Sequence, residues 1–490
     1  MKNCLSKQHL RHLKIINLLY ANKNMTLDKI SYTLNFNSRT LRKDIEQINS
    51  YAAPIEILSS KKGFYTYIPM NYNINYLYAA ILQDSTEFSL IEEIFFNENH
   101  SIDSLSEKLF ISSSTLRRTI SYLNKTLKKK KIKISSQPLL LTGNEAEICN
   151  LIIHLIEEKY GIANIPFPKI QIGALDKILT WVAKTNAQRM DFCELNRLRL
   201  WIMVILTRVR NGHIQTKDAT FPDGIDTSLL KNKVLTGLFK SVFKIELTEQ
   251  VAYSLFGVFI QTKFAFSYEH LKELATKYET VKTSIERNQQ LLETLSSKLE
   301  IPIENQEHIL INIYNTSVLS TNLSSDSSYI LYNTSQALVN QITNQHPYFT
   351  DILNEALKKI FGASEYNPSK RDTLTYILLT HWRNLSIHLQ QGTPTVNVGI
   401  LLDTDIEHME LIKDELHLQF DNKFNLSITD EFTLSAFKKK ASMYDIIVTN
   451  IPGLSFKNNT MVVCISMFPT PLDIENLHNC YNKLTSVAQR

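Results

Sequence analysis

The chain has 490 residues, of which 43% are hydrophobic and 21% are charged, and its formal net charge is +5. Only 12 residues are glycine and 13 are proline, which excludes a disordered, collagenous or low-complexity chain. The length predicts several domains of about 100–150 residues each, and the scarcity of glycine favours a mostly helical fold.

Cysteine usage and hydropathy bear on the compartment. The five cysteines are far apart, and no two have C-x-x-C spacing, so neither a disulfide framework nor a zinc site is expected. We find no apolar stretch behind the N-terminus and no run of about 18 apolar residues. Nucleotide-binding, zinc-hydrolase and serine-nucleophile motifs are also missing. We therefore expect a cytoplasmic protein that is not an enzyme and needs no metal or cofactor.

The positive charge is concentrated near the N-terminus. Residues 1–75 hold 11 Lys+Arg and 4 Asp+Glu, and residues 101–135 hold 9 and 2, so each window has a net charge of +7. Residues 164–490 hold 32 and 33, a net charge of −1. Two short basic windows indicate a surface for nucleic acid, although solvated helix faces would show the same charge.

The two basic windows are copies of one another. Residues 26–49 align without a gap on residues 101–124, with nine identities in 24 positions. Leu27, Ile30 and Leu34 predict a first helix in the first copy, and the spacing of Leu41, Ile45 and Ile48 predicts a second. The segment 35–37 between them reads as a tight turn, with Ser38 as the expected N-cap of the second helix. Each copy is therefore expected to be a helix-turn-helix.

The second helix of each copy has the pattern of a recognition helix. At about 100° per residue, Arg39, Arg42 and Lys43 point away from the buried face, as do Ser114, Arg117 and Arg118 in the second copy. A short hairpin is predicted after each copy, which makes each a winged helix. We expect contacts to double-stranded DNA from the two helices and from the lysines of the first wing. The candidate residues are Arg39, Thr40, Arg42, Lys43, Lys61, Lys62, Ser114, Thr115, Arg117 and Arg118.

Two tandem winged helices, the second ending in SSQPLLLTGNEAEI (Ser135–Ile148), resemble the Mga/AtxA class of Gram-positive virulence regulators. The resemblance implies a DNA-binding transcriptional regulator that also carries two phosphotransferase-system regulation domains and a C-terminal domain similar to sugar-transport enzyme IIB. It further implies a phosphocarrier protein of that system as a partner, and a homodimer formed through the C-terminal domain.

The middle of the chain, from Lys169 to about Gln391, has a helical pattern with breaks at Phe221–Gly224 and Ser320–Ser328. In the regulation domains of the family, a phosphorylated histidine lies eleven residues before a glycine. The resemblance places His381 at that position before Gly392, with His388 seven residues further on. The equivalent position before Gly212 is Trp201, so His213 is the nearest substitute. Phosphorylation is expected at His381, with His213 and His388 as further candidates.

The C-terminal part alternates strand and helix patterns, which predicts a small parallel α/β domain. Enzyme IIB uses a cysteine in the loop after its first strand. Here that loop reads Asp403-Thr404-Asp405, and Cys464 is expected to be buried within a strand. A phosphocysteine is therefore not expected.

These patterns predict a mostly α, multidomain fold. The expected parts are winged helix 1 (1–70), winged helix 2 (71–164), two regulation-domain-like bundles (165–288 and 289–392) and the α/β domain (393–490). Three alternatives stay open: an RNA-binding antiterminator with two regulation domains, a DNA-binding regulator that has lost control by the phosphorelay, and a phosphotransfer enzyme.

Overall fold

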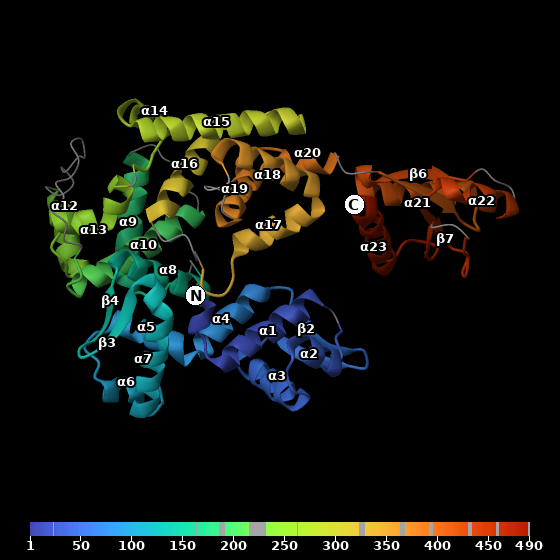
Figure 1. Ribbon diagram of the computed structural model, residues 1–490. Coiled ribbons are helices and arrows are strands. Elements are labelled where there is room, and N and C mark those ends of the chain that lie inside the picture. Colours follow the sequence, from blue (N-terminus) through green and yellow to red (C-terminus); the bar gives the residue numbers. More distant parts are fainter. Residues whose placement is uncertain are drawn as a thin grey trace. The chain divides into compact units, whose positions relative to one another are not determined.

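The computed structural model describes residues 1–22, 24–161, 164–185, 192–214, 232–261, 263–322, 329–362, 368–391, 395–429, 434–456 and 460–488. The chain forms two compact units: Met1–Ser284 with Ile311–Ala337, and Ile285–Leu310 with Leu338–Arg490. Helices dominate both units, as predicted (Figure 1). None of the helices in the described ranges is long and apolar enough to cross a membrane.

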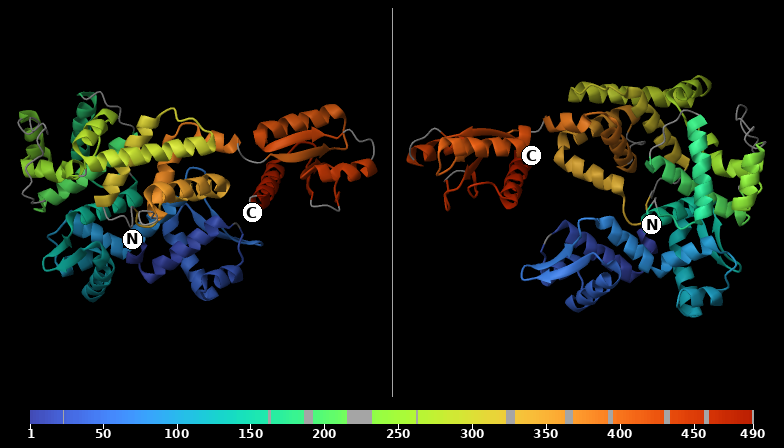
Figure 2. Two further views of the ribbon diagram at one scale, coloured as in Figure 1. Left: turned by 45° about the horizontal axis from the view of Figure 1, so that its top comes forward. Right: turned by 180° about the vertical axis from the view of Figure 1, so that it is seen from behind.

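The first 160 residues contain two helix-turn-helix segments, each followed by an antiparallel hairpin. Figure 2 shows the first hairpin projecting from its helices. The elements of the first copy are α1 (Lys7–Ala21), α2 (Leu27–Leu34), α3 (Ser38–Ala52), β1 (Glu56–Ser60) and β2 (Gly63–Tyr67). Those of the second are α4 (Ile74–Asp84), α5 (Thr86–Phe96), α6 (Ile102–Lys108), α7 (Ser113–Leu127), β3 (Ile132–Ser136), β4 (Leu139–Gly143) and α8 (Glu145–Tyr160). Both predicted winged helices are confirmed.

The two copies bury equivalent apolar side chains because the helical period brings them onto one face. Leu41, Ile45 and Ile48 are buried in α3, and Leu116, Ile120 and Leu123 are buried in α7. The predicted N-cap Ser38 is wrong by one residue. Asn37 caps α3 instead, because its side-chain oxygen accepts the Arg39 N–H at 2.8 Å.

The middle of the chain is helical, as predicted. Its elements are α9 (Lys169–Thr185), α10 (Phe192–Arg210), α12 (Lys233–Leu238), the π-helix η3 (Phe239–Phe243), α13 (Glu249–Gln261), α14 (Tyr268–Lys277), α15 (Glu279–Leu299), α16 (Gln306–Asn322), α17 (Thr334–Gln345), α18 (Pro347–Phe361), α19 (Pro368–His381) and α20 (Leu385–Gln391). The predicted break at Phe221–Gly224, residues 323–328 of the second break and Gly392 lie outside the described residues. Helix α16 continues as far as Asn322.

The C-terminal part is the predicted parallel α/β domain. Its elements are β5 (Val396–Leu401), α21 (Ile406–Phe420), β6 (Phe424–Ile428), α22 (Leu434–Lys440), β7 (Ile446–Thr449), β8 (Met461–Cys464) and α23 (Pro471–Ala488). The strands are parallel in the order β6-β5-β7-β8. Helices α21 and α23 pack on one face of the sheet, and α22 packs on the other.

The expected burial of Cys464 is wrong, because the structure exposes this residue. Cys464 is the last residue of β8, and β8 is an edge strand. Alternation along the strand turns its neighbour Val463 into the core and Cys464 to the opposite side.

Candidate nucleic-acid interface and histidine sites

Helix α3 presents the predicted cationic face. Arg39, Arg42 and Lys43 are exposed, and Thr40 is half-buried at the side of the same face. Within the described ranges, no acidic side chain forms an ion pair with any of the three cations, so their charge is available to an outside partner. A rigid helix that carries unpaired guanidinium and ammonium groups can bind phosphates and the edges of guanine bases.

Helix α7 presents the equivalent face in the second copy. Ser114, Arg117 and Arg118 are exposed. Thr115 is half-buried, and its hydroxyl interacts with the Ser112 hydroxyl at 2.8 Å within the N-terminal cap. Arg118 also lies within 3.5 Å of that hydroxyl. The second face therefore combines two arginines with a serine-rich helix start, and Thr115 contributes mainly to capping.

The two wings differ in where their lysines lie. Lys61 and Lys62 are exposed at the tip of the first wing, between β1 and β2. The second wing has Gln137 and Pro138 at its tip, and its lysines lie at its base, where Lys128, Lys129 and Lys131 are exposed. Only the first wing can therefore present lysines to DNA from its tip.

The first wing is held against the start of α2 by a short bridge. Met25 and Phe64 exchange two backbone hydrogen bonds, at 2.9 and 2.7 Å. Gly63 precedes this bridge with φ +122°, and a Cβ at that position would lie 2.5 Å from the Met25 carbonyl. Only glycine fits there, because both the left-handed backbone and the close approach exclude a side chain.

The two copies share an asparagine, Asn49 or Asn124, whose side chain joins the recognition helix to the wing. We call this pair of hydrogen bonds the clamp. Asn49 Nδ2 donates to the Ile57 carbonyl oxygen at 3.0 Å, and the Ile57 N–H donates to Asn49 Oδ1 at 2.8 Å. Asn124 makes the same pair of bonds to Ile134, at 2.9 and 2.7 Å. The amide side chain thus replaces a missing strand partner and fixes the angle between helix and wing. Its position in both copies marks it in the sequence, but its role becomes visible only in the structure.

We predict that Asn49→Ala and Asn124→Ala each lower the free energy of unfolding by about 1–3 kcal/mol, because a part-buried N–H and C=O lose their partners. Urea unfolding followed by circular dichroism measures this loss. Ser50→Ala, an exposed neighbour of Asn49, is the matched control and should change stability by about 0.5 kcal/mol or less. Equal stability of Asn49→Ala and Ser50→Ala would contradict the clamp.

A partly buried ion pair fixes α3 against α1. The Arg11 guanidinium binds the carboxylate of Asp44, which is buried in α3, through two bonds of 2.8 and 2.9 Å. His12 is also buried beside Asp44, and its Nδ1 lies 3.1 Å from the Tyr51 hydroxyl. Burial lowers the pKa of His12 in spite of the opposing attraction of Asp44. The recognition helix is therefore held by polar as well as apolar contacts.

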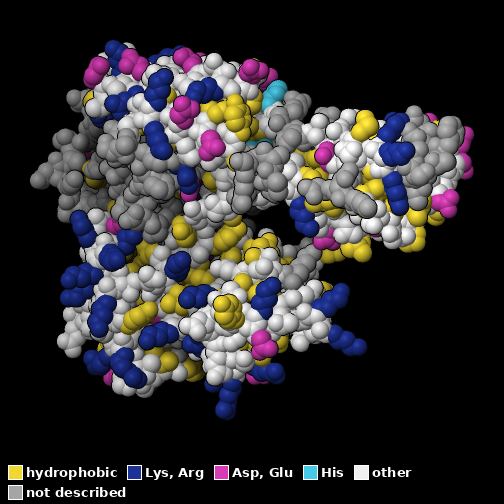
Figure 3. Space-filling model, turned by 45° about the vertical axis from the view of Figure 1, so that its right-hand side comes forward, with side chains coloured by type: hydrophobic (Ala, Val, Ile, Leu, Met, Phe, Trp, Pro, Cys, Tyr) yellow, Lys and Arg dark blue, Asp and Glu magenta, His cyan; other side chains and the backbone are white. Residues whose placement is uncertain are grey.

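Figure 3 shows the charge on one face of the molecule. Lys and Arg side chains are spread over the lower part of that view, where the winged helices lie, and few acidic side chains lie among them. In the described part of the two basic windows, most Lys and Arg side chains are exposed.

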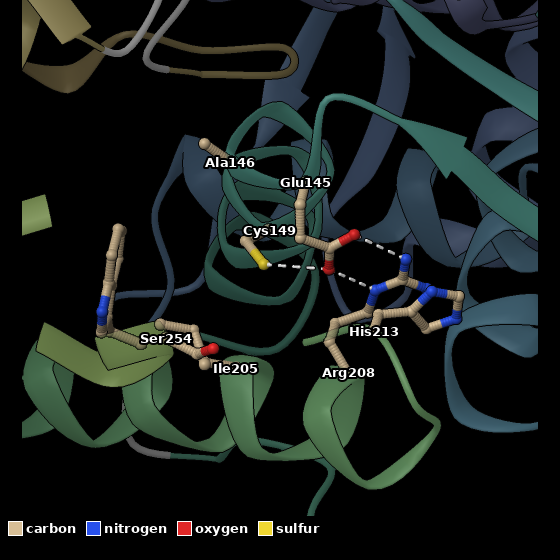
Figure 4. Close-up of a pocket in the computed structure, with 8 residues that line it drawn as sticks. Glu145, Ala146, Cys149, Ile205, Arg208, His213 and Ser254 are labelled. Atoms are coloured by element: carbon tan, nitrogen blue, oxygen red, sulfur yellow. Dashed lines mark hydrogen bonds and ion pairs between the residues drawn. The ribbon is translucent and has the colours of Figure 1, made fainter. Parts of the chain in front are cut away.

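A second polar cluster, missed by the sequence predictions, joins the second winged helix to α10. Arg208 is buried, and its guanidinium binds the Glu145 carboxylate at 2.6 and 2.8 Å, Glu98 at 2.8 Å and the Leu141 carbonyl at 3.1 Å. His213 Nε2 lies 2.8 and 2.9 Å from the two Glu98 oxygens. Figure 4 shows the Glu145 carboxylate facing the Arg208 guanidinium, with His213 beside it. We call Arg208, Glu145, Glu98 and His213 the Arg208 cluster.

The position of His213 limits its use as a phosphorylation site. Its Nε2 faces a carboxylate, which would have to leave before a phosphoryl group could bind there. Trp201, at the family's histidine position, is half-buried, and its indole N–H donates to the Leu255 carbonyl at 3.4 Å. In the first bundle, the position where the family has its histidine is thus filled by an indole ring.

His381 lies at the end of α19 and is half-buried. Its Nδ1 is 3.1 Å from the Ile377 carbonyl oxygen and 2.7 Å from the Thr380 hydroxyl. The ring of His308, from α16, lies 5.3 Å from the His381 ring, a proximity that the sequence did not indicate. His388 is half-buried in the next helix, α20. Arg383 is exposed two residues after His381 and could neutralise a phosphoryl group nearby.

The loop after β5, where enzyme IIB has its cysteine, is held by hydrogen bonds to a side chain of the loop and to the side chain that follows β7. The Asp405 carboxylate caps α21 by accepting the His408 N–H at 2.8 Å. The Asp403 N–H donates to Asn450 Oδ1 at 2.7 Å. An acidic cap occupies the helix end at which a phosphate would otherwise bind.

Comparisons with known proteins agree with this arrangement. Residues 6–55 match the family model of the M protein trans-acting positive regulator (MGA) HTH domain, residues 70–155 match the Mga helix-turn-helix domain, and residues 173–385 match the M protein trans-acting positive regulator (MGA) PRD domain. Over 467 residues the chain is 27% identical to a putative trans-acting regulator of Streptococcus pneumoniae, which covers 93% of this chain and 94% of the relative. It is 22% identical over 486 residues to the anthrax toxin expression trans-acting positive regulator of Bacillus anthracis, covering 95% of this chain and 97% of the relative.

Shorter similarity extends to another regulator. The capsule synthesis positive regulator AcpA of Bacillus anthracis is 26% identical over 207 residues, which is 41% of this chain and 43% of the relative. Two winged helices with cationic recognition faces, followed by regulation-domain helices, define a transcriptional regulator. The chain belongs to the Mga family of trans-acting regulators, as the sequence resemblance predicted.

Proposed function

We propose that the chain binds double-stranded DNA in promoter regions through α3, α7 and the tip of the first wing. The observation that carries this proposal is the duplicated helix-turn-helix, in which Arg39, Arg42, Arg117 and Arg118 are exposed on helices fixed to a small core. Phosphate contacts from these side chains and from Lys61 and Lys62 would supply affinity, and the arginines would read bases.

A direct comparison of ligands tests this function. Fluorescence anisotropy with labelled duplex DNA and with a hairpin RNA of equal length, over a salt series, should show tighter binding to the duplex. The logarithm of the binding constant should fall steeply with the logarithm of salt concentration, by about 0.9 for each phosphate contact. Tighter binding to the RNA hairpin would favour the antiterminator alternative and contradict the proposal.

His381 is the histidine whose position best supports regulation by the phosphotransferase system. It is partly accessible, adjacent to an exposed arginine and opposite His308. A phosphoryl group from the phosphocarrier protein would add about two negative charges at the junction of α19, α16 and α20 and could change their packing. His213 is a weaker candidate, because a carboxylate already occupies its Nε2.

We predict that His381→Ala removes most of the phosphate that the purified general phosphorelay transfers to the chain. Phosphohistidine mapping by mass spectrometry at neutral pH measures the transfer. His388→Ala and His213→Ala are the matched controls and should retain it. Undiminished labelling of His381→Ala would exclude this residue as the main acceptor, and no labelling of the wild type would support a regulator that has lost the phosphorelay.

The five parts expected from the sequence, 1–70, 71–164, 165–288, 289–392 and 393–490, remain our proposed division of the chain. Self-association through the C-terminal α/β domain is also part of the proposal. It is supported by exposed apolar side chains at the start of α21 and around the start of α23, namely Ile406, Met467, Phe468 and Leu472.

A further inference from the structure

The two helix-turn-helix copies have the same turn geometry but a different residue at its apex. Asn35 has φ +55° in the first copy, and Phe110, at the equivalent position, has φ +54° in the second. The residue that follows donates its N–H to the equivalent carbonyl in each copy, Phe36 to Ser31 at 3.2 Å and Ile111 to Ser106 at 3.0 Å. Asparagine tolerates this left-handed conformation well, whereas a bulky aromatic residue is strained in it.

Packing against the core does not explain why a phenylalanine occupies this turn. Its two chain neighbours, Leu109 and Ile111, pack against the core, but Phe110 itself is 95% exposed. The first copy has a shallow hollow at this turn, lined in part by Tyr32, Asn35 and Asn37. A strained, fully exposed aromatic side chain therefore lowers the stability of the free protein and stabilises no other part of its own fold.

The surroundings of Phe110 indicate what it meets. The turn leads directly into α7, whose first turns carry the exposed Ser114, Arg117 and Arg118. A cationic helix start next to an apolar side chain matches the major groove, where phosphates border the C5-methyl groups of thymine. A protein partner would need an apolar patch beside an acidic one, whereas DNA has both features in every thymine-containing site.

We propose that Phe110 is a specificity-determining DNA contact of the second winged helix, with its ring against the C5-methyl group of a thymine beside the α7 footprint. This inference rests on the proposed DNA binding. It gives the two copies different tasks, because the first has a polar asparagine where the second has an apolar ring. The two winged helices would then recognise an asymmetric DNA site even though they share one fold.

Phe110→Asn separates stability from recognition, because asparagine fits the turn as it does in the first copy. The variant should keep its Tm or gain about 2–4 °C, yet bind about five- to tenfold more weakly to duplexes that the wild type selects from a random pool. Phe110→Leu keeps an apolar side chain and should retain most of the affinity. Met70→Asn, which changes another fully exposed apolar side chain, is the matched control and should bind as the wild type does.

Replacing single thymines by uracil in the selected duplex removes only the C5-methyl group. At one position this change should weaken binding of the wild type but leave binding of Phe110→Asn unaffected. Equal affinities of the wild type and Phe110→Asn, or equal sensitivity of both to every uracil, would overturn the inference. If the wild type selects no duplex at all, the proposed DNA binding fails instead, so the two failures are distinguishable.

Discussion

Replacing Arg42 and Arg117 by alanine together is expected to weaken promoter binding by about 10²- to 10⁴-fold at constant salt. Each arginine lies on the exposed face of a recognition helix, and each bidentate contact to a guanine contributes about 1–3 kcal/mol. Neither side chain forms an ion pair within the described ranges, so the fold should lose about 0.5 kcal/mol or less per substitution.

Anisotropy titrations with one promoter fragment, together with thermal unfolding, measure both effects. Lys438→Ala with Lys439→Ala is the matched control, because it removes the same charge from exposed positions of α22. The control should bind with nearly wild-type affinity. If the arginine pair and the lysine pair have the same effect, net charge rather than the recognition helices determines binding.

The second large effect is expected from Arg208→Ala, which should lower the free energy of unfolding of the first unit by about 3–5 kcal/mol. Arg208 is buried and binds two carboxylates and a backbone carbonyl, so its removal leaves the half-buried carboxylates of Glu98 and Glu145 without this cation. Removing one partner of a buried ion pair lowers the free energy of unfolding by about this amount, because the remaining charge stays desolvated.

Chemical denaturation of the full chain measures this loss, with Arg210→Ala as the control. Arg210 lies two residues further along α10 and is exposed, so its removal should have little effect. Arg208→Lys should be nearly as harmful as alanine, because an ammonium group cannot satisfy several acceptors in the fork geometry of a guanidinium. Wild-type stability of Arg208→Ala would mean that water reaches the Arg208 cluster and hydrates the carboxylates.

The Arg208 cluster also shows how the bundle and the second winged helix are connected. Glu145 begins α8 directly after the wing, and Arg208 lies near the end of α10, a helix within the region that matches the PRD domain. Charged contacts thus link the end of α10 to the base of the second wing. No local sequence pattern indicates this connection, because Arg208 binds residues that are 63 and 110 positions away in the chain.

The sequence by itself determined the features that depend on local periodicity. The spacing of Leu41, Ile45 and Ile48 sets which face of α3 is buried, so the exposure of Arg42 and Lys43 followed from a period of about 3.6 residues. Alternating strand and helix patterns likewise predicted the parallel sheet of the C-terminal domain. The internal repeat identified the winged helices, because nine identities in a gapless alignment indicate that the two segments have the same fold.

Only the tertiary structure decided the features that depend on residues distant in the chain or on the packing around a site. Cys464 is exposed because β8 is an edge strand, and strand order is not written in the local pattern. His308 and His381 meet because α16 and α19 pack together, and Arg208 reaches Glu98 across more than a hundred residues. Phe110 is apolar, yet it lies in a left-handed turn and is 95% exposed. Hydrophobicity predicts that a side chain will be buried, but the backbone conformation and the neighbouring elements determine whether it can be.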